Sequence, residues 1–551
     1  MSTRPDRPLS EADRPELRER LRAAIELLER VAGDRGLLAM LDREDRGRLL
    51  RAAAEVHSPD PAARRRLVKT FSRLRRNARA QADDDQLAGT GIRSLRRQRV
   101  FTSPNAFAPT GFLPEDIAPD DEDEVRAREL SDHQVESRPA NGTGAAGVAE
   151  RACYICKQRF TQVHSFYDRL CPECGDFNLA KRSELADLSG RVALLTGGRV
   201  KIGYQAGLKL LRCGAHLIVT TRFPRDSAMR YAQEPDFEQW RDRLEVFGLD
   251  LRHTPSVEAF CHHLLATRSR LDYIINNACQ TVRRPPDFYA HMMDGETAAL
   301  HTMPEHARRL LGAYEGLRGY HLLPEGPAPS GPPADAGLQP LAARAAALAG
   351  LTHAAALSQV PLLPGEQQAQ NDLFPQGRLD EDLQQVDLRS HNSWRMLLAE
   401  VPTVELLEVQ LVNAIAPFVL DARLKPLLIR TPERDKHIVN VSAMEGQFYR
   451  SFKTTRHPHT NMAKAALNML TRTAAADYQQ DGIHMNSVDT GWVTDEDPAE
   501  IAARKTAEHR FHPPLDIVDG GARIVDPIIS GVITGEHVWG QFLKDYRPTP
   551  W

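Results

Sequence analysis

The stretch VALLTGGRVKIGYQAGLKLL, residues 192–211, decides the fold. Its apolar start predicts a buried strand, the glycines Gly197, Gly198 and Gly203 predict a tight turn, and the remainder has the apolar spacing of a helix. The next apolar run, LIVTTR at 217–222, completes a βαβ unit. A glycine turn that leads into a helix presents backbone N–H groups to a phosphate. We therefore expect an α/β fold with a doubly wound parallel Rossmann-type sheet and a dinucleotide site at this turn.

Further short motifs follow along the chain in a fixed order: GLDLRH (248–253), LDYIINNACQ (271–280), LVNAIAPF (411–418), HIVNVSAMEG (437–446), MNSVDTGWVTDE (485–496) and GQFLKDY (540–546). Together with the glycine turn, they resemble the ordered motifs of the short-chain dehydrogenase/reductase superfamily. The resemblance covers most of residues 187–551. It implies hydride transfer between a nicotinamide dinucleotide and a small carbonyl or alcohol substrate. The cofactor contacts that it implies are Gly197, Gly198, Arg199, Gly203, Arg222, Asp250, Asn277, Ala278, Lys464 and Gly491.

The residues at the end of the second strand indicate which dinucleotide is bound. Users of NAD in this kind of fold place an acidic residue there for the ribose 2′-hydroxyl. This chain has Thr221 and Arg222 instead, with Arg199 and Lys201 in the glycine turn. Cations at this place suit a 2′-phosphate, so we expect NADP, and NAD remains possible if these basic residues only face solvent.

The catalytic residues that the resemblance implies are only partly kept. Ser442, Lys464 and Asn413 stand at the positions of the family's serine, lysine and asparagine, but Thr460 replaces its tyrosine. A threonine hydroxyl is far less acidic than a phenol, so it can orient a substrate or pass a proton but cannot serve alone as the acid.

Other groups could supply the proton, namely His459, His457, Tyr449 in the preceding loop, or a water held through Lys464 and Asn413. Two hypotheses therefore stay open. One is an NADP-dependent oxidoreductase with a substitute proton donor. The other is a nucleotide-binding scaffold or sensor without hydride chemistry.

The cysteines predict a metal site. Cys153, Cys156, Cys171 and Cys174 form two Cys-x-x-Cys pairs separated by fourteen residues. Two such pairs suit a closed tetrahedral Cys₄ shell around structural zinc, with no position left for a catalytic water. His164, between the pairs, is interpreted as a surface residue or a substitute ligand. The module supports the fold or binds a protein partner.

The chain is expected to have several parts. These are a helical N-terminal region to about residue 100, a flexible linker at 101–150, the cysteine module at 151–184, and the Rossmann-type domain at 185–551. A large insertion at about 281–400 interrupts this domain and could cap the pocket, recognise a substrate or form a subunit contact. Within it, Asn392, Trp394 and Arg395 are interpreted as anchors for packing or recognition.

Composition limits the partners. The 551 residues carry a net charge of −3, so no general attraction to nucleic acid or to an anionic membrane is expected. No secretory signal is readable, and no run approaches the ~20 uninterrupted apolar residues of a membrane span, so the cytoplasm is expected. Family members commonly dimerise through two helices, here 403–424 and 461–478, and both carry more apolar positions than one buried stripe needs. We expect a homodimer or a larger oligomer.

Overall fold

The computed structural model describes residues 14–57, 61–95, 150–312, 314, 353–366, 372–375, 377–380, 384–448, 453–494, 496–498 and 512–551. The chain divides into two compact units, Met1–Ala82 and Asp83–Trp551. The expected linker at 101–149 lies outside the described residues, as does Tyr449.

The smaller unit is helical, as the sequence predicts. It contains α1 (Arg14–Gly33), η2 (Arg35–Met40), α2 (Arg43–His57) and the first part of α3 (Pro61–Ala88). The apolar residues of α1 remain largely exposed, including Leu21 and Ile25. The boundary falls earlier than residue 100, because α4 (Gly91–Leu95) belongs to the larger unit. There, buried Arg93 lies 2.5 Å from the Asp168 carboxylate of the cysteine module.

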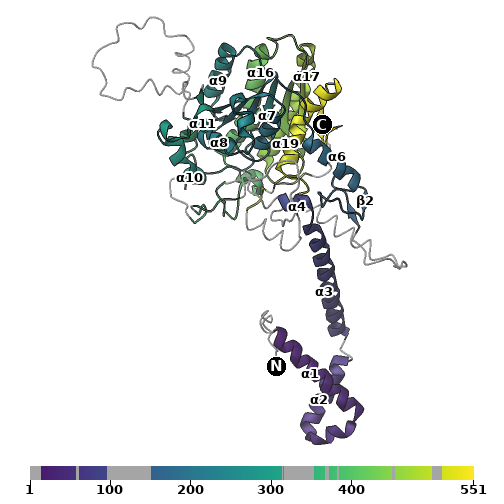
Figure 1. The fold of residues 1–551 in the computed structure, drawn as a ribbon. Coiled ribbons are helices and arrows are strands. Elements are labelled where there is room, and N and C mark those ends of the chain that lie inside the picture. The colour runs from purple at the N-terminus through teal and green to yellow at the C-terminus, as the bar shows by residue number, and fades with distance from the viewer. Residues whose placement is uncertain are drawn as a thin grey trace, which may run out of the picture. The chain divides into compact units, whose positions relative to one another are not determined.

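The larger unit is built on one eight-stranded sheet, shown in Figure 1. The strand order is β10-β9-β8-β7-β6-β3-β4-β5, and every pairing is parallel except that of β10 with β9. The order reverses between β3 and β6, which makes the carboxyl end of this pair the topological switch point where ligands bind in such sheets. The strand bounds are β3 (Val192–Thr196), β4 (His216–Thr221), β5 (Leu244–Gly248), β6 (Tyr273–Asn276), β7 (Lys436–Ser442), β8 (Ile483–Asp489), β9 (Phe542–Lys544) and β10 (Arg547–Thr549).

Helices cover both faces of the sheet, so its central strands are apolar on both sides, as a buried parallel sheet requires. One core packs α7 (Lys201–Arg212) and α19 (Ile517–Thr534) against inward side chains such as Leu195 and Val219. The other packs α9 (Thr254–Thr267), α16 (Ala416–Leu428) and α17 (Pro458–Gln480) against Leu194 and Ile274. The expected α/β fold with a doubly wound sheet is confirmed.

The insertion begins with α10 (Pro286–Thr297), η5 (Leu300–Thr302) and α11 (Glu305–Arg309), and continues with α14 (Ala354–Leu357), η6 (Ser393–Arg395) and η7 (Leu398–Glu400). Buried ion pairs tie it to the sheet domain. Arg283 Nε lies 2.9 Å from Glu408 of α15 (Thr403–Gln410), and Arg395 forms two contacts of 2.5 Å with Asp497. Asn392 Nδ2 donates to the Glu496 carbonyl. Asn392 and Arg395 therefore serve packing, one of the two roles that the sequence left open for them.

One segment of the described chain, Thr403–Leu428, is long and apolar enough to span a membrane by length and composition, with a mean hydropathy of 1.5. Charged residues such as Glu405, Glu408 and Asp421 interrupt it, so it is not an uninterrupted apolar run of the length considered from the sequence. Half of the segment is buried inside the domain, because it forms α15, the following π-helical turn and α16 against the sheet. This placement is that of a core helix.

Candidate functional site: a dinucleotide-sized cavity and a cysteine cluster

A cavity of about 1270 Å³ runs along the carboxyl edge of the sheet. Its walls come from the loops after β3, β4 and β5 on one side of the switch point and after β6, β7 and β8 on the other. Every cofactor residue expected from the sequence lines it except Gly198. The sequence motifs thus converge on one hollow at the place where an open α/β sheet binds its ligand.

The glycine turn is closely packed beneath this cavity. Gly197 has a φ of +70°, and a Cβ there would lie 2.8 Å from Ala278 Cα. Gly203 lies in the first turn of α7, where a Cβ would lie 2.3 Å from both the Gly197 carbonyl oxygen and Asn277 Nδ2. Asn277 donates from that amide to the Thr196 carbonyl at 3.0 Å. Only glycine fits at these two positions, and the backbone at the start of α7 stays open to a ligand.

Arg222 marks one end of the cavity. Its guanidinium donates to Tyr289 Oη at 2.6 Å and lies over the same ring, and no carboxylate pairs with it among the described residues. Arg199 is instead paired with Asp226 at 2.8 Å, and Asp250 with Arg252 at 2.6 Å. Burial raises the pKa of the Asp250 carboxyl, but the hydrogen bonds and charge of Arg252 outweigh it, so that pKa is lowered. Arg222 is therefore one cation at this end that can meet an anionic ligand.

The other end of the cavity holds the residues expected to be catalytic. Ser442 ends β7, and Thr460 and Lys464 lie one helical turn apart on α17. The hydroxyls of Ser442 and Thr460 are buried, and neither has a hydrogen-bond partner in the described part of the chain. Lys464 Nζ donates to the Val441 carbonyl at 2.8 Å. Buried hydroxyls without partners are rare in proteins, and a bound ligand is one explanation for them.

Asn413 does not line the cavity. It lies in η8 (Leu411–Ile415), a π-helical turn between α15 and α16, of the type often found at functional sites. Its Oδ1 accepts from the Gln280 N–H at 2.7 Å, and its Nδ2 donates to the Gln280 carbonyl at 3.1 Å. The structure therefore gives Asn413 a positioning role for the loop after β6 rather than direct contact with the cavity.

The two histidines considered as proton donors contact other side chains. His457 stacks on Trp394 with ring centroids 3.9 Å apart, and burial together with the charges of His459 and Lys453 lowers its pKa to about 4. His459 lies with its Nε2 3.6 Å from the Glu405 carboxylate. Neither side chain lines the cavity. The hypothesis that His459 or His457 replaces the missing tyrosine is thus not supported by the geometry.

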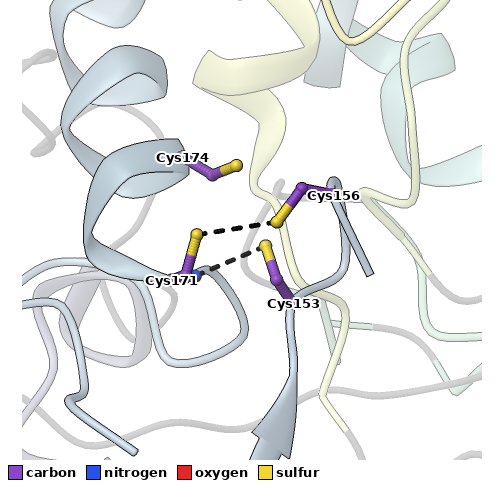
Figure 2. A group of neighbouring side chains, drawn as sticks. All are labelled: Cys153, Cys156, Cys171 and Cys174. Atoms are coloured by element: carbon purple, nitrogen blue, oxygen red, sulfur yellow. Dashed lines mark hydrogen bonds between the residues drawn. The ribbon is translucent and has the colours of Figure 1, made fainter. Parts of the chain in front are cut away.

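The four cysteines converge as predicted, and Figure 2 shows their sulfur atoms facing one another. Cys153 and Cys156 come from the turn between β1 (Arg151–Ala152) and β2 (Arg159–Phe160), whereas Cys171 and Cys174 lie at the start of α6 (Pro172–Ser183). All four sulfurs lie within 4.8 Å of one another, and those of Cys156 and Cys171 are 3.7 Å apart. Tetrahedral Zn–S bonds of ~2.3 Å give sulfur separations of about 3.8 Å. The residues therefore fit a zinc ion.

His164 is not a fifth candidate ligand. It is buried, against the expectation of a surface residue, and its Nδ1 accepts from the N–H groups of Phe166 and Tyr167 at 3.0 and 3.1 Å. Burial raises the pKa of the Cys171 thiol, whereas at Cys153 hydrogen bonds from backbone N–H groups outweigh burial and lower the pKa. A bound cation would keep the four sulfurs deprotonated together.

Several cavity residues carry no motif that would have identified them. Tyr289, Gln384 and Trp394 come from the insertion, and Tyr154 comes from the loop between the first two cysteines. The insertion therefore contributes walls to the cavity, one of the roles that the sequence left open for it. Trp394, expected only as an anchor, both packs on His457 and lines the cavity.

Comparison with known proteins agrees with this arrangement. Residues 383–514 match the family described as Enoyl-(Acyl carrier protein) reductase. An uncharacterized protein of Acanthamoeba polyphaga mimivirus is 31% identical over 389 residues, which cover 69% of this chain and 71% of the viral protein. Dehydrogenase/reductase SDR family member 13 of Bos taurus is 34% identical over 116 residues, but this chain spans only 30% of the bovine protein.

Among solved structures, the RhlG/NADP active-site complex of Pseudomonas aeruginosa is similar over 65% of this chain and 95% of its own, with a TM-score of 0.38 and 15% identity.

Proposed function

We propose that the chain transfers hydride between NADP(H) and a carbonyl or alcohol substrate, because its ordered motifs resemble those of the short-chain dehydrogenase/reductase superfamily and residues 383–514 match a reductase family. The observation that carries this proposal is the pair of unpartnered hydroxyls, Ser442 and Thr460, beside Lys464 in a cavity that continues to the glycine turn. A scaffold that only binds a nucleotide would not need buried hydroxyls without partners at the end of the cavity opposite Arg222. Bound NADPH would supply the hydride.

The residues of this chain bind the substrate oxygen and supply the proton. The Ser442 hydroxyl donates a hydrogen bond to the carbonyl oxygen and stabilises the negative charge that develops there. The Lys464 ammonium is the proton source, and the Thr460 hydroxyl, one turn away on α17, passes the proton to the product oxygen. Thr460 thereby serves as a relay and not as the acid itself. Its two neighbours His457 and His459 take no part, because neither lines the cavity.

The function is tested by following NADPH absorbance with a panel of aldehydes and ketones. Ser442→Ala is expected to lower kcat/KM about 100-fold, the effect of removing one donor to a developing oxyanion. NADPH affinity in the same variant should change by less than about twofold, because the hydroxyl contacts the substrate and not the cofactor. NADPH binding without turnover of any compound in the panel, in wild type as in Ser442→Ala, would favour the scaffold instead.

The cofactor is proposed to be NADP(H) in preference to NAD(H), because no carboxylate of the described residues pairs with Arg222, which can bind a 2′-phosphate bidentately. Arg222→Asp is expected to weaken NADPH binding at least tenfold and to improve NADH binding, since a carboxylate suits the ribose hydroxyls. Isothermal titration of both cofactors measures this, with Arg212→Ala, a cation paired with Asp236 outside the cavity, as the control. Equal affinities of wild type for NADPH and NADH would contradict the preference.

We further propose a homodimer formed through α15, α16 and α17. These helices leave large apolar side chains exposed on the domain, namely Leu407, Ile415, Phe418, Met462 and Met469. Phe418 is 57% exposed, so Phe418→Glu should leave the fold intact and shift the protein to a monomer at micromolar concentration. Light scattering on both proteins measures the mass, and a monomeric wild type would rule the interface out.

A further inference from the structure

We propose that the cysteine module is part of the cofactor site. Its zinc-binding loop places Tyr154 against the turn after β8, where the phenol positions the nicotinamide half of NADP(H). This inference rests on the proposed function, and it assigns to the zinc ion an influence on cofactor affinity.

The module is joined to the sheet domain by buried polar contacts and a shared core. Arg182 of α6 donates to both carboxylate oxygens of Asp516 at 2.5 and 2.8 Å, and Tyr167 Oη donates to Asp519 at 2.5 Å. Asp516 caps α19, which packs along the dinucleotide helix α7. Side chains of the module also share a hydrophobic cluster with Val493 and Leu515 of the sheet domain. The module is therefore held in one position relative to the cavity.

The metal-binding loop fixes the direction of Tyr154. Its backbone N–H donates to the Arg169 carbonyl at 2.9 Å, and its carbonyl accepts from Lys157 Nζ at 2.7 Å. Cys153 and Cys156 stand on either side, so a zinc ion bound by both would clamp the loop at each end. Tyr154, Ile155 and Lys157 of this loop all line the cavity.

The phenol of Tyr154 meets the sheet domain at the glycine turn after β8. The Trp492 N–H donates to Tyr154 Oη at 3.0 Å. Gly491 has a φ of +74°, and a Cβ there would lie 2.6 Å from Leu515 Cδ1 and 3.5 Å from the phenol oxygen. The turn is thus enclosed between Leu515 and Tyr154, and its conformation depends on both.

This turn lies at the Ser442 end of the cavity. Asp489, the last residue of β8, is the register partner of Ser442 on β7. Arg222 follows β4, which is four strand positions from β8, or ~19 Å at the usual strand spacing. A dinucleotide with its 2′-phosphate at Arg222 therefore brings its nicotinamide half toward the Tyr154 turn, and an adenosine fragment that stops at the Arg222 end does not reach it.

The test compares two probes on the full chain by isothermal titration: NADPH, and 2′,5′-ADP, which carries only the adenosine half. Tyr154→Ala is expected to weaken NADPH about tenfold and to leave 2′,5′-ADP within about twofold. Tyr154→Phe, which keeps the ring but leaves the Trp492 N–H without its acceptor, should weaken NADPH by a smaller factor. Arg159→Ala, an exposed change on β2 of the same module, is the control and should alter neither affinity.

Removal of zinc by a chelator should weaken NADPH binding at least as much as Tyr154→Ala does, and added Zn²⁺ should reverse the loss, with zinc content measured on each sample. Equal weakening of both probes in Tyr154→Ala would indicate a general folding defect and overturn the inference, as would unchanged NADPH affinity. Wild type that binds neither probe would instead overturn the proposed function, so the two failures are distinguishable.

Discussion

Cys156→Ser is expected to release the zinc ion and to lower the free energy of unfolding of the larger unit by about 5 kcal/mol or more. Cys156 is exposed, so loss of its sulfur removes little packing, and a surface change of this kind ordinarily costs within ~0.5 kcal/mol. A large loss can therefore come only from the metal. It should extend beyond the module, because Arg182 and Tyr167 tie the module to the start of α19.

The matched control is Cys279→Ser, an exposed cysteine outside the cluster. It should keep one zinc per chain and wild-type stability. Metal analysis and urea unfolding of the two variants, purified in reducing buffer, give the comparison. Wild type with much less than one equivalent of zinc, or equal stability of the two variants, would show that the four cysteines do not bind a structural metal.

The sheet could be predicted from the sequence because its signals are local. An apolar run such as 192–196 followed by Gly197 specifies a buried strand and a turn without reference to the rest of the chain. The carboxyl ends of parallel strands share one edge, and Ser442 and the glycine turn accordingly line one cavity.

The helical period of α17 also predicts which candidate proton donors lie on the same face of the helix as Lys464. Residues four apart on a helix differ by about 40° and residues five apart by about 140°. Thr460 therefore shares a face with Lys464, whereas His459 does not, and the structure places only the first two in the cavity. His459 would need a backbone adjustment to reach the cavity, but α17 already begins at Pro458 and fixes the positions of both residues.

The docking of the cysteine module could not be predicted in the same way. Arg182 and Asp516 are 334 residues apart, and Tyr154 meets Trp492 across 338. The spacing of residues along the sequence does not indicate that positions so far apart are in contact. The residue types themselves do not indicate a contact either. The pairing depends on where α6 comes to lie after the sheet has formed, which is tertiary information. The same holds for Tyr289 and Trp394 of the insertion.

Thr460→Tyr is expected to raise kcat/KM for small aldehydes about 1000-fold, within the range that a well-placed general acid contributes. The change puts a phenol of ordinary pKa ~10 one turn from the Lys464 ammonium, which lowers the pKa of the phenol and makes it a useful acid near neutral pH. Thr460 lines the cavity and its buried hydroxyl has no partner among the described residues, so a larger side chain at this position has the hollow to extend into.

Two further variants separate the acid from other causes of a gain. Lys464→Met, added to Thr460→Tyr, should remove the gain, and Ser442→Ala, added to the same change, should lower it about 100-fold. The basic limb of the pH profile of kcat/KM should move to lower pH in Thr460→Tyr than in wild type, because the donor is then a phenol with a lowered pKa and no longer the Lys464 ammonium, and each must be protonated to donate. A folded Thr460→Tyr protein that binds NADPH but reduces no aldehyde faster than wild type would mean that Ser442 and Lys464 are not arranged around a reacting carbonyl. Their retention would then serve nucleotide binding alone, and the chain would be a scaffold in which the loss of the tyrosine was complete.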